Sequence, residues 1–197
     1  YLELAPEYPT VYNNMGNAYV GKGEYVIAIK NYEKAISLDS HYMEPRKNLA
    51  IIYKKEGETA KAMEEYRKAI EIEPGNPDLY QSMGIIYAEQ GLFDKAVKAF
   101  ETALRKDPLS TEAHYGLGIL YEGKGMDMKA FQEYQEELAI NPSYSEARIA
   151  IGNLYAKNGR PREAKREFLA VLKEEPDNEE ARLSLHKLRE MKLLIRP

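Results

Sequence analysis

Residues of the same kind recur every 34 positions along almost the whole chain. Tyrosine recurs at Tyr19, Tyr53, Tyr87, Tyr121 and Tyr155, and glycine at Gly23, Gly57, Gly91, Gly125 and Gly159. Three further series hold alanine (Ala28, Ala62, Ala96, Ala130, Ala164), an aromatic ring (Tyr32, Tyr66, Phe100, Tyr134, Phe168) or a small residue (Gly16, Ala50, Gly84, Gly118, Gly152). Five series in one register indicate an array of copies of one structural unit.

The repeating unit has the spacing of two α-helices. Apolar or small residues such as Gly84 and Tyr87, and then Ala96 and Phe100, follow one another at three- or four-residue intervals. The glycine series falls between these two runs, where a helix end favours a residue that tolerates left-handed backbone. Prolines close four units: Pro74, Pro108, Pro142 and Pro176. We therefore expect helix A, a tight turn, helix B and a short loop in each of the repeats 9–42, 43–76, 77–110, 111–144 and 145–178.

Two further features agree with an all-helical chain. Acidic residues open helix A in four repeats, where they favour the positive end of the helix dipole: Glu44, Asp78, Glu112 and Glu146. No segment alternates polar and apolar residues with period two, so we expect no β-strand.

The two ends of the chain differ from the five whole repeats. Leu2, Leu4 and Pro6 match Ile70, Ile72 and Pro74 in register, so residues 1–8 are interpreted as the end of a preceding repeat. Residues 179–197 begin like another helix A, with Ala181, Leu185 and Leu188. They then place His186 and Arg189 where a small residue and a tyrosine belong. A polar outer face is typical of a capping helix, so we expect the array to end there.

The order of small residue, aromatic, alanine, aromatic and proline at a 34-residue period resembles the tetratricopeptide repeat (TPR) family. The resemblance implies an all-α, right-handed superhelical solenoid of helix-turn-helix hairpins, in which helices A line a concave groove. It also implies a scaffold that binds another protein or a peptide. We number positions 1–34 within each repeat. The small residue at position 8 and the alanine at position 20 let the two helices approach, and the aromatics at 11 and 24 fill the space between neighbouring hairpins.

Composition and motifs argue against several other functions. A net charge of −4 argues against nucleic-acid binding, and no run reaches the roughly 18 apolar residues that a membrane span needs, so no membrane insertion is expected. Two G-x₄-G-K stretches, beginning at Gly16 and Gly118, resemble a phosphate loop, but they lack the following Ser or Thr and lie in helix A. The three histidines, His41, His114 and His186, fall at unrelated repeat positions, and the chain has no cysteine. We therefore expect no catalytic residues, no metal, no cofactor and no enzymatic activity.

Two residues depart from the pattern in the fourth repeat. Glu137 stands at position 27, where the other repeats have Ala35, Ala69, Ala103 and Val171. We expect its carboxylate to reach solvent at the edge of the repeat. The alternative is a buried charge paired with Lys or Arg, or a packing irregularity used for recognition. His114 stands at position 4, which is aromatic in the first and third repeats, and we expect it to pack.

The TPR resemblance implies that a ligand lies against positions 2, 5, 6, 9, 12 and 13 of helices A. The candidate groove residues are therefore Asn13, Asn14, Asn17, Lys47, Asn48, Ile51, Lys54, Ser82, Ile85, Tyr115, Ile119 and Asn153. We hypothesise a peptide or amphipathic helix whose apolar face meets the row Ile51, Ile85 and Ile119, and whose acidic or amide-rich part meets Lys47, Lys54 and the asparagines. The alternative is that the isoleucines only pack neighbouring helices A.

Two known ligand modes of the family fit this chain poorly. Of the residues that clamp a terminal carboxylate, only Asn17 and Asn48 match, and Asp78 has the wrong sign. A ladder of asparagines at position 6 begins with Asn14 and Asn48 but is broken by Ser82 in the next repeat. Besides the interaction scaffold, two functions stay open: the targeting domain of a larger enzyme such as a glycosyltransferase, and a self-assembling scaffold in which this chain forms a homo-oligomer.

Overall fold

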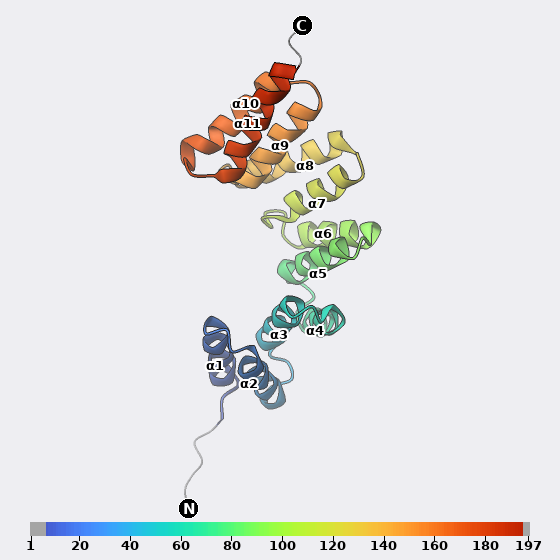
Figure 1. The fold of residues 1–197 in the computed structure, drawn as a ribbon. Coiled ribbons are helices and arrows are strands. Elements are labelled where there is room, and N and C mark those ends of the chain that lie inside the picture. Colours follow the sequence, from blue (N-terminus) through green and yellow to red (C-terminus); the bar gives the residue numbers. More distant parts are fainter. Residues whose placement is uncertain (1–6, 195–197) are drawn as a thin grey trace, which may run out of the picture. The chain divides into compact units, whose positions relative to one another are not determined.

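The computed structural model describes residues 7–194, and the side chains as far as Glu190. The described residues form eleven α-helices and no β-strand (Figure 1). The helices are α1 (Pro9–Gly21), α2 (Tyr25–Leu38), α3 (Met43–Lys55), α4 (Thr59–Ile72), α5 (Pro77–Glu89), α6 (Phe93–Lys106), α7 (Ala113–Gly123), α8 (Asp127–Ile140), α9 (Ser145–Lys157), α10 (Pro161–Glu174) and α11 (Glu179–Leu194). Consecutive helices pair as hairpins, so the predicted all-α solenoid of hairpins is confirmed.

The chain divides into two compact units. Unit 1 ends at Asp107 and contains α1 to α6, and unit 2 begins at Pro108 and contains α7 to α11. The repeat boundaries and the right-handed superhelix stay predictions. The predicted end of a preceding repeat depends on Leu2, Leu4 and Pro6, which lie outside the described residues.

Each hairpin turns at the glycine of the 34-residue series. All five of these glycines have positive φ, between 70° and 79°. In the first hairpin, Gly23 N–H donates to the carbonyl of Val20, and Glu24 N–H donates to the carbonyl of Tyr19, both at 2.9 Å. These bonds satisfy the last carbonyls of helix A while the chain reverses. The sequence prediction of a glycine C-cap is confirmed.

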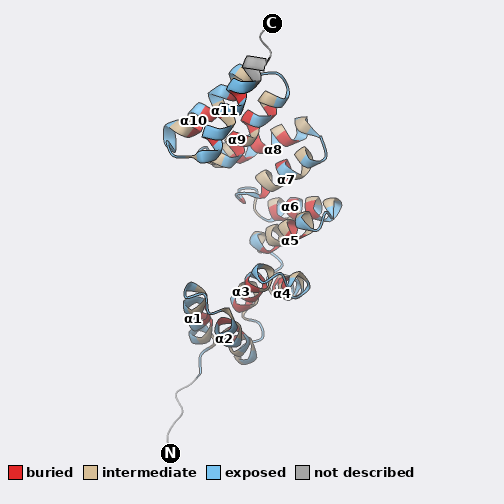
Figure 2. Ribbon diagram, in the orientation of Figure 1, coloured by how far each residue is buried: buried red, intermediate tan, exposed pale blue. Residues whose placement is uncertain are grey.

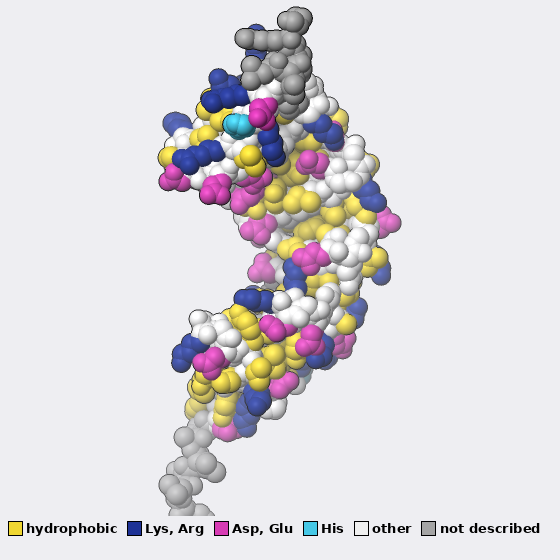
Figure 3. Space-filling view, in the orientation of Figure 1, with side chains coloured by type: hydrophobic (Ala, Val, Ile, Leu, Met, Phe, Trp, Pro, Cys, Tyr) yellow, Lys and Arg dark blue, Asp and Glu magenta, His cyan; other side chains and the backbone are white. Residues whose placement is uncertain are grey.

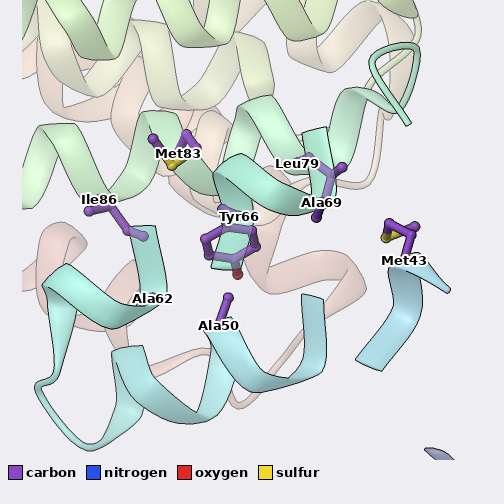
Figure 4. Packing of buried hydrophobic residues seen from close by; sticks show 8 residues of the cluster. All are labelled: Met43, Ala50, Ala62, Tyr66, Ala69, Leu79, Met83 and Ile86. Carbon is purple, nitrogen blue, oxygen red and sulfur yellow. The ribbon is translucent and has the colours of Figure 1, made fainter. Parts of the chain in front are cut away.

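Within each hairpin, the small residue at position 8 faces the aromatic ring at position 24. A Cβ added to Gly118 would lie 2.3 Å from the Tyr134 ring, and one added to Gly152 would lie 2.4 Å from Phe168. Figure 4 shows the same arrangement in the second hairpin, where Ala50 lies below the ring of Tyr66. The Tyr66 ring also packs against α5, so it joins the second hairpin to the third.

Buried residues, coloured red on the ribbon in Figure 2, occur along the helices of both units. In the second and third repeats, Tyr66 and Ala69 of α4 share one cluster with Leu79, Met83 and Ile86 of α5. A single hairpin could not cover these residues alone, so the second and third repeats depend on each other for burial.

The fourth repeat departs from the others in two places. We expected Glu112 in the first turn of a helix; instead α7 begins at Ala113, and Glu112 precedes it with φ 69°. We also expected Glu137 to reach solvent; instead it is fully buried on α8, at 0% exposure. The alternative of an ion pair is also wrong, because within the described part of the chain its bond is to the backbone N–H of Glu112, at 2.9 Å. The buried carboxyl needs a donor, and the backbone N–H at the start of α7 supplies it.

Candidate peptide-binding surface

The candidate groove residues lie on helices A in both units. Unit 1 carries nine of them, on α1, α3 and α5, and unit 2 carries the other three, Tyr115, Ile119 and Asn153, on α7 and α9. We describe the surface of each unit separately.

Three asparagines from α1 and α3 converge in unit 1. The side-chain amide of Asn48 donates to the Oδ1 atoms of Asn13 and Asn17, at 3.1 Å in each case. The hydroxyl of Tyr32 also donates to Asn17 Oδ1, at 2.7 Å. Asn13 is only 5% exposed, whereas Asn17 is exposed. Asn13 therefore orients Asn48, and the outer atoms of the cluster face solvent.

The cluster keeps hydrogen-bonding capacity toward solvent. In the described structure, Asn48 Oδ1 and the Nδ2 atoms of Asn13 and Asn17 make no hydrogen bond, and Asn14, which follows Asn13 on α1, is exposed. An asparagine amide offers both a donor and an acceptor, which is the same pair of groups that a peptide unit offers. We refer to Asn13, Asn14, Asn17 and Asn48 as the asparagine cluster.

The two lysines expected in the groove differ in their surroundings. Lys54 on α3 forms an ion pair with Glu89 on α5, at 2.8 Å. Lys47 is partly buried and forms no ion pair within residues 7–194. Lys54 therefore already has an acidic partner, and Lys47 is the better candidate to meet an acidic ligand.

The isoleucines present apolar surface in both units. Ile51 is 50% exposed on α3, and Ile85 is partly buried at the equivalent position of α5. Ile119 on α7 is 49% exposed. Half-exposed isoleucines are only partly used in packing, so they leave apolar area for a ligand.

Tyr115 and Ser82 contact other residues of the repeats. The Tyr115 ring lies 5.6 Å from the ring of Tyr134 and 5.2 Å from that of Tyr144, measured between centroids. Burial raises the pKa of Tyr115 above its usual range. The hydroxyl of Ser82 lies close to that of Tyr66. Asn153 is exposed on α9.

One set of interactions was not predicted from the sequence. In three repeats, the residue at position 4 forms an ion pair with the residue at position 23. Arg46 pairs with Glu65 at 3.1 Å, His114 with Glu133 at 2.7 Å, and Arg148 with Glu167 at 3.3 Å. The expected packing role of His114 was therefore incomplete, because its ring also binds a carboxylate.

The signal for these pairs was present in the sequence. The two repeats without a base at position 4 also lack glutamate at position 23, having Tyr12 with Asn31, and Tyr80 with Ala99. Comparing the five repeats with one another would have indicated the contact. The hydrogen bond from Glu133 raises the pKa of His114 above its usual value.

The described residues contain no group of three or more His, Cys, Asp or Glu side chains that could hold a metal ion. None of the described helices combines the length and the apolar character needed to cross a bilayer. On the face drawn in Figure 3, basic and acidic side chains are interspersed over both units.

Three solved structures illustrate the likeness to known proteins. The crystal structure of MamA is 25% identical, has a TM-score of 0.71, and the match covers 82% of this chain and 94% of MamA. A tetratricopeptide repeat protein from Parabacteroides merdae ATCC 43184 is 24% identical, with a TM-score of 0.77, covering 93% of this chain and 73% of that protein. YrrB, described as a TPR protein with an unusual peptide-binding site, is 22% identical, with a TM-score of 0.65, covering 86% of this chain and 88% of YrrB.

Family models match nearly the whole repeat array, although no curated protein matches the sequence. Models of the tetratricopeptide repeat match residues 9–42, 82–145 and 129–188, and a TPR repeat model matches residues 52–91. With the 34-residue period, the glycine turns and the paired helices, these matches show that the chain belongs to the tetratricopeptide repeat family.

Proposed function

We propose that this chain is a protein-interaction scaffold that binds an extended peptide on the helix A face of unit 1. TPR repeats generally serve as non-catalytic scaffolds for protein partners, which supports the broad assignment. The observation that carries the finer proposal is the asparagine cluster, in which Asn48 of α3 bonds to Asn13 and Asn17 of α1.

The cluster suits the backbone of a peptide more than any one side chain. The amide nitrogen of Asn48 is occupied by its two partners, so its Oδ1 is directed to accept a hydrogen bond. Asn14 and Asn17 can donate through Nδ2. Acceptor and donor groups side by side match the N–H and C=O of an extended peptide, so the peptide needs no particular side chain at this point.

Selectivity comes from the residues around the cluster. Ile51, at 50% exposure one turn along α3 from Asn48, offers an apolar contact, and Ile85 offers a smaller one on α5. Lys47 offers a positive charge next to Asn48. The ligand expected here therefore carries an aliphatic side chain close to an acidic one.

The test begins with selection of peptides from a random displayed library on the immobilised chain. Selected peptides are then titrated in solution by fluorescence anisotropy. We expect Asn14→Ala and Asn48→Ala each to weaken binding by about tenfold, which is the effect of losing one good hydrogen bond of about 1.4 kcal/mol. A peptide that is N-methylated at one backbone amide should weaken similarly with the wild-type chain.

The matched control is Asn31→Ala on α2. Asn31 donates to the carbonyl of Ile27 in its own helix and does not belong to the asparagine cluster. We expect it to leave the affinity unchanged. Equal affinities of wild type, Asn14→Ala and Asn48→Ala, with the helical signal intact in circular dichroism, would remove unit 1 from the proposal.

A further inference from the structure

The tyrosines at position 11 each lie under a cation of the chain itself. In all five repeats a lysine or arginine lies over this ring, with 4.6–5.8 Å between the charged group and the ring centroid. Such a cation is attracted to the negative face of the ring. The pairs are Lys22 with Tyr19, Lys61 with Tyr53, Lys95 with Tyr87, Lys129 with Tyr121, and Arg160 with Tyr155.

Within the described part of the chain, Tyr115 and Tyr144 of unit 2 have no such cation. Their rings meet edge to face, with 5.2 Å between centroids, and both residues are partly buried. Neither hydroxyl makes a hydrogen bond to another residue of the described structure. A tyrosine hydroxyl in such a position usually finds a partner, so these two keep hydrogen-bonding capacity for a ligand.

The charges around Tyr115 are negative. Burial raises the pKa of Tyr115 above its usual range, and the carboxylates of Glu146, Glu180 and Glu122 raise it further. No lysine or arginine among the described residues offsets these carboxylates at Tyr115. None of the three carboxylates forms an ion pair within residues 7–194. A positively charged group therefore fits the surroundings of the Tyr115 ring.

Glu122 is the carboxylate that its own helix does not stabilise. Glu146 and Glu180 lie in the first turns of α9 and α11, where the helix dipole favours an acidic residue. Glu122 lies in the last turn of α7, where the dipole favours a cation, and it accepts a hydrogen bond from Tyr134 at 2.8 Å. Its position 12 holds Lys54 in the second repeat and apolar residues in the other three. A cation of a ligand would offset this unfavourable charge.

We propose that this site of unit 2 binds an arginine side chain of a partner protein, with the guanidinium over the ring of Tyr115 and bonded to Glu122. The chain itself contains the same arrangement. Arg160 lies over Tyr155 at 4.6 Å and donates through Nε to Glu163 at 2.9 Å. A guanidinium suits the site better than an ammonium, because it is planar, stacks on an aromatic ring and has five N–H donors for carboxylates and hydroxyls.

The arginine site is separate from the peptide surface proposed on unit 1. It uses Tyr115 and Glu122 of α7, whereas the asparagine cluster lies on α1 and α3. It also takes a basic group, whereas Lys47 beside the asparagine cluster favours an acidic one. Failure of one proposal therefore leaves the other standing.

The test uses the whole chain and the capped tripeptide Leu-Arg-Leu. Its leucines can meet Ile119, which is 49% exposed one turn along α7 from Tyr115. Binding is followed through the backbone amide resonances of Gly116 and Ile119 in proton–nitrogen correlation NMR spectra, and we expect saturable shifts at millimolar peptide. The matched control peptide carries citrulline, which has the shape of arginine without its charge, and should give no saturable shift.

Variants of the chain locate the bound arginine. Glu122→Gln should weaken binding by about fivefold, because it keeps an acceptor for Tyr134 and removes the charge. Glu174→Gln, at an exposed position of α10, makes the same change in net charge and should leave the affinity unchanged. Asn48→Ala should also leave it unchanged, which separates this test from that of the asparagine cluster.

A further variant tests the ring. Tyr115→Ile introduces the residue that the fifth repeat has at this position, and it should abolish the saturable shifts. The proposal is overturned if Leu-Arg-Leu gives no shift on α7, if the citrulline peptide binds equally well, or if Glu122→Gln and Glu174→Gln have the same affinity. Equally tight binding of Leu-Lys-Leu would also overturn it, because stacking of the guanidinium would then contribute nothing.

Discussion

The backbone N–H of Glu112 donates to the buried carboxylate of Glu137 at 2.9 Å, across 25 residues of sequence. This bond links the two irregularities of the fourth repeat. Glu137 takes a position that is alanine in three other repeats, and Glu112 has left-handed backbone at the start of a shortened helix. The second oxygen of the carboxyl, Oε1, is buried without a partner in the described structure.

We predict that Glu137→Ala stabilises the protein. An unsatisfied buried oxygen costs about 1–3 kcal/mol, and alanine restores the residue that three of the other repeats have at this position. The free energy of unfolding should rise by about 1 kcal/mol, net of the small cavity and the lost bond to Glu112. Urea titration measures it, with Glu136→Ala at the neighbouring exposed position as the control. A loss of more than 1 kcal/mol would mean that the carboxyl stabilises α7 more than its burial costs.

The left-handed conformation of Glu112 gives a second prediction. Asparagine tolerates this region and a β-branched residue does not. Both Glu112→Asn and Glu112→Val remove the glutamate side chain, so the difference between them reports on the backbone. We expect the valine variant to be less stable than the asparagine variant by about 1–2 kcal/mol. Equal melting curves would show that α7 can begin earlier, with Glu112 helical.

The ion pair of His114 with Glu133 makes part of the stability depend on pH. The hydrogen bond from Glu133 raises the folded-state pKa of His114 above its value of 6.5 in the unfolded chain. The pair should therefore make its full contribution to the free energy of unfolding below pH 6.5. This contribution should be lost as the pH rises through the raised pKa of His114. We expect about 1 kcal/mol of stabilisation at pH 5.5 relative to Glu133→Gln, and less at pH 8.5.

Arg148 and Glu167 provide the matched control, because they occupy the same two positions in the fifth repeat. Arginine stays protonated throughout this range. The stability difference between wild type and Glu167→Gln should therefore be constant from pH 5.5 to 8.5. Parallel curves for the two pairs would contradict the role given to His114, and an NMR titration of its ring would measure the pKa directly.

Two glycines of α7 should respond to alanine in opposite ways. A Cβ at Gly118 would lie 2.3 Å from the ring of Tyr134, which is held by a hydrogen bond to Glu122 at 2.8 Å. Gly118→Ala should therefore cost about 2 kcal/mol. A Cβ at Gly123 would meet nothing within 4 Å, so Gly123→Ala should add about 0.5–1 kcal/mol through helix propensity. Thermal melts of both variants check this, and a neutral Gly118→Ala would show that Tyr134 can move aside.

Much of the fold could be predicted from the sequence because it depends on short spacings repeated five times. The turn at Gly23 and its counterparts requires only a residue that tolerates positive φ. The contact of Gly118 with Tyr134 follows from their separation of 16 residues, because one tight turn folds this segment back as a hairpin. The geometry of a helix and a tight turn, together with burial against a repeat of the same pattern, therefore determines these turns and contacts almost completely.

The binding surface was less predictable, because its polar contacts join different helices. Asn48 bonds to Asn13 and Asn17 across 35 and 31 residues, and Lys54 of α3 forms an ion pair with Glu89 of the next helix A, α5. The side chain of a lysine or asparagine has several rotamers, and the choice depends on which donor or acceptor the adjacent helix brings near. Spacing alone does not contain that choice.

The sequence by itself determined the repeat, the hairpins, the turns and the family, because each depends on residue type at a fixed spacing. Only the tertiary structure decided that Glu137 is buried and accepts a hydrogen bond from the N–H of Glu112. It also decided that His114 binds Glu133 and that the asparagines of the cluster form one hydrogen-bonded network. It also showed that Val11 and Met15 are exposed, although residues at the same two repeat positions are buried in other repeats. The physical reason is that burial and hydrogen-bond partners belong to the space between helices, which a one-dimensional pattern does not specify.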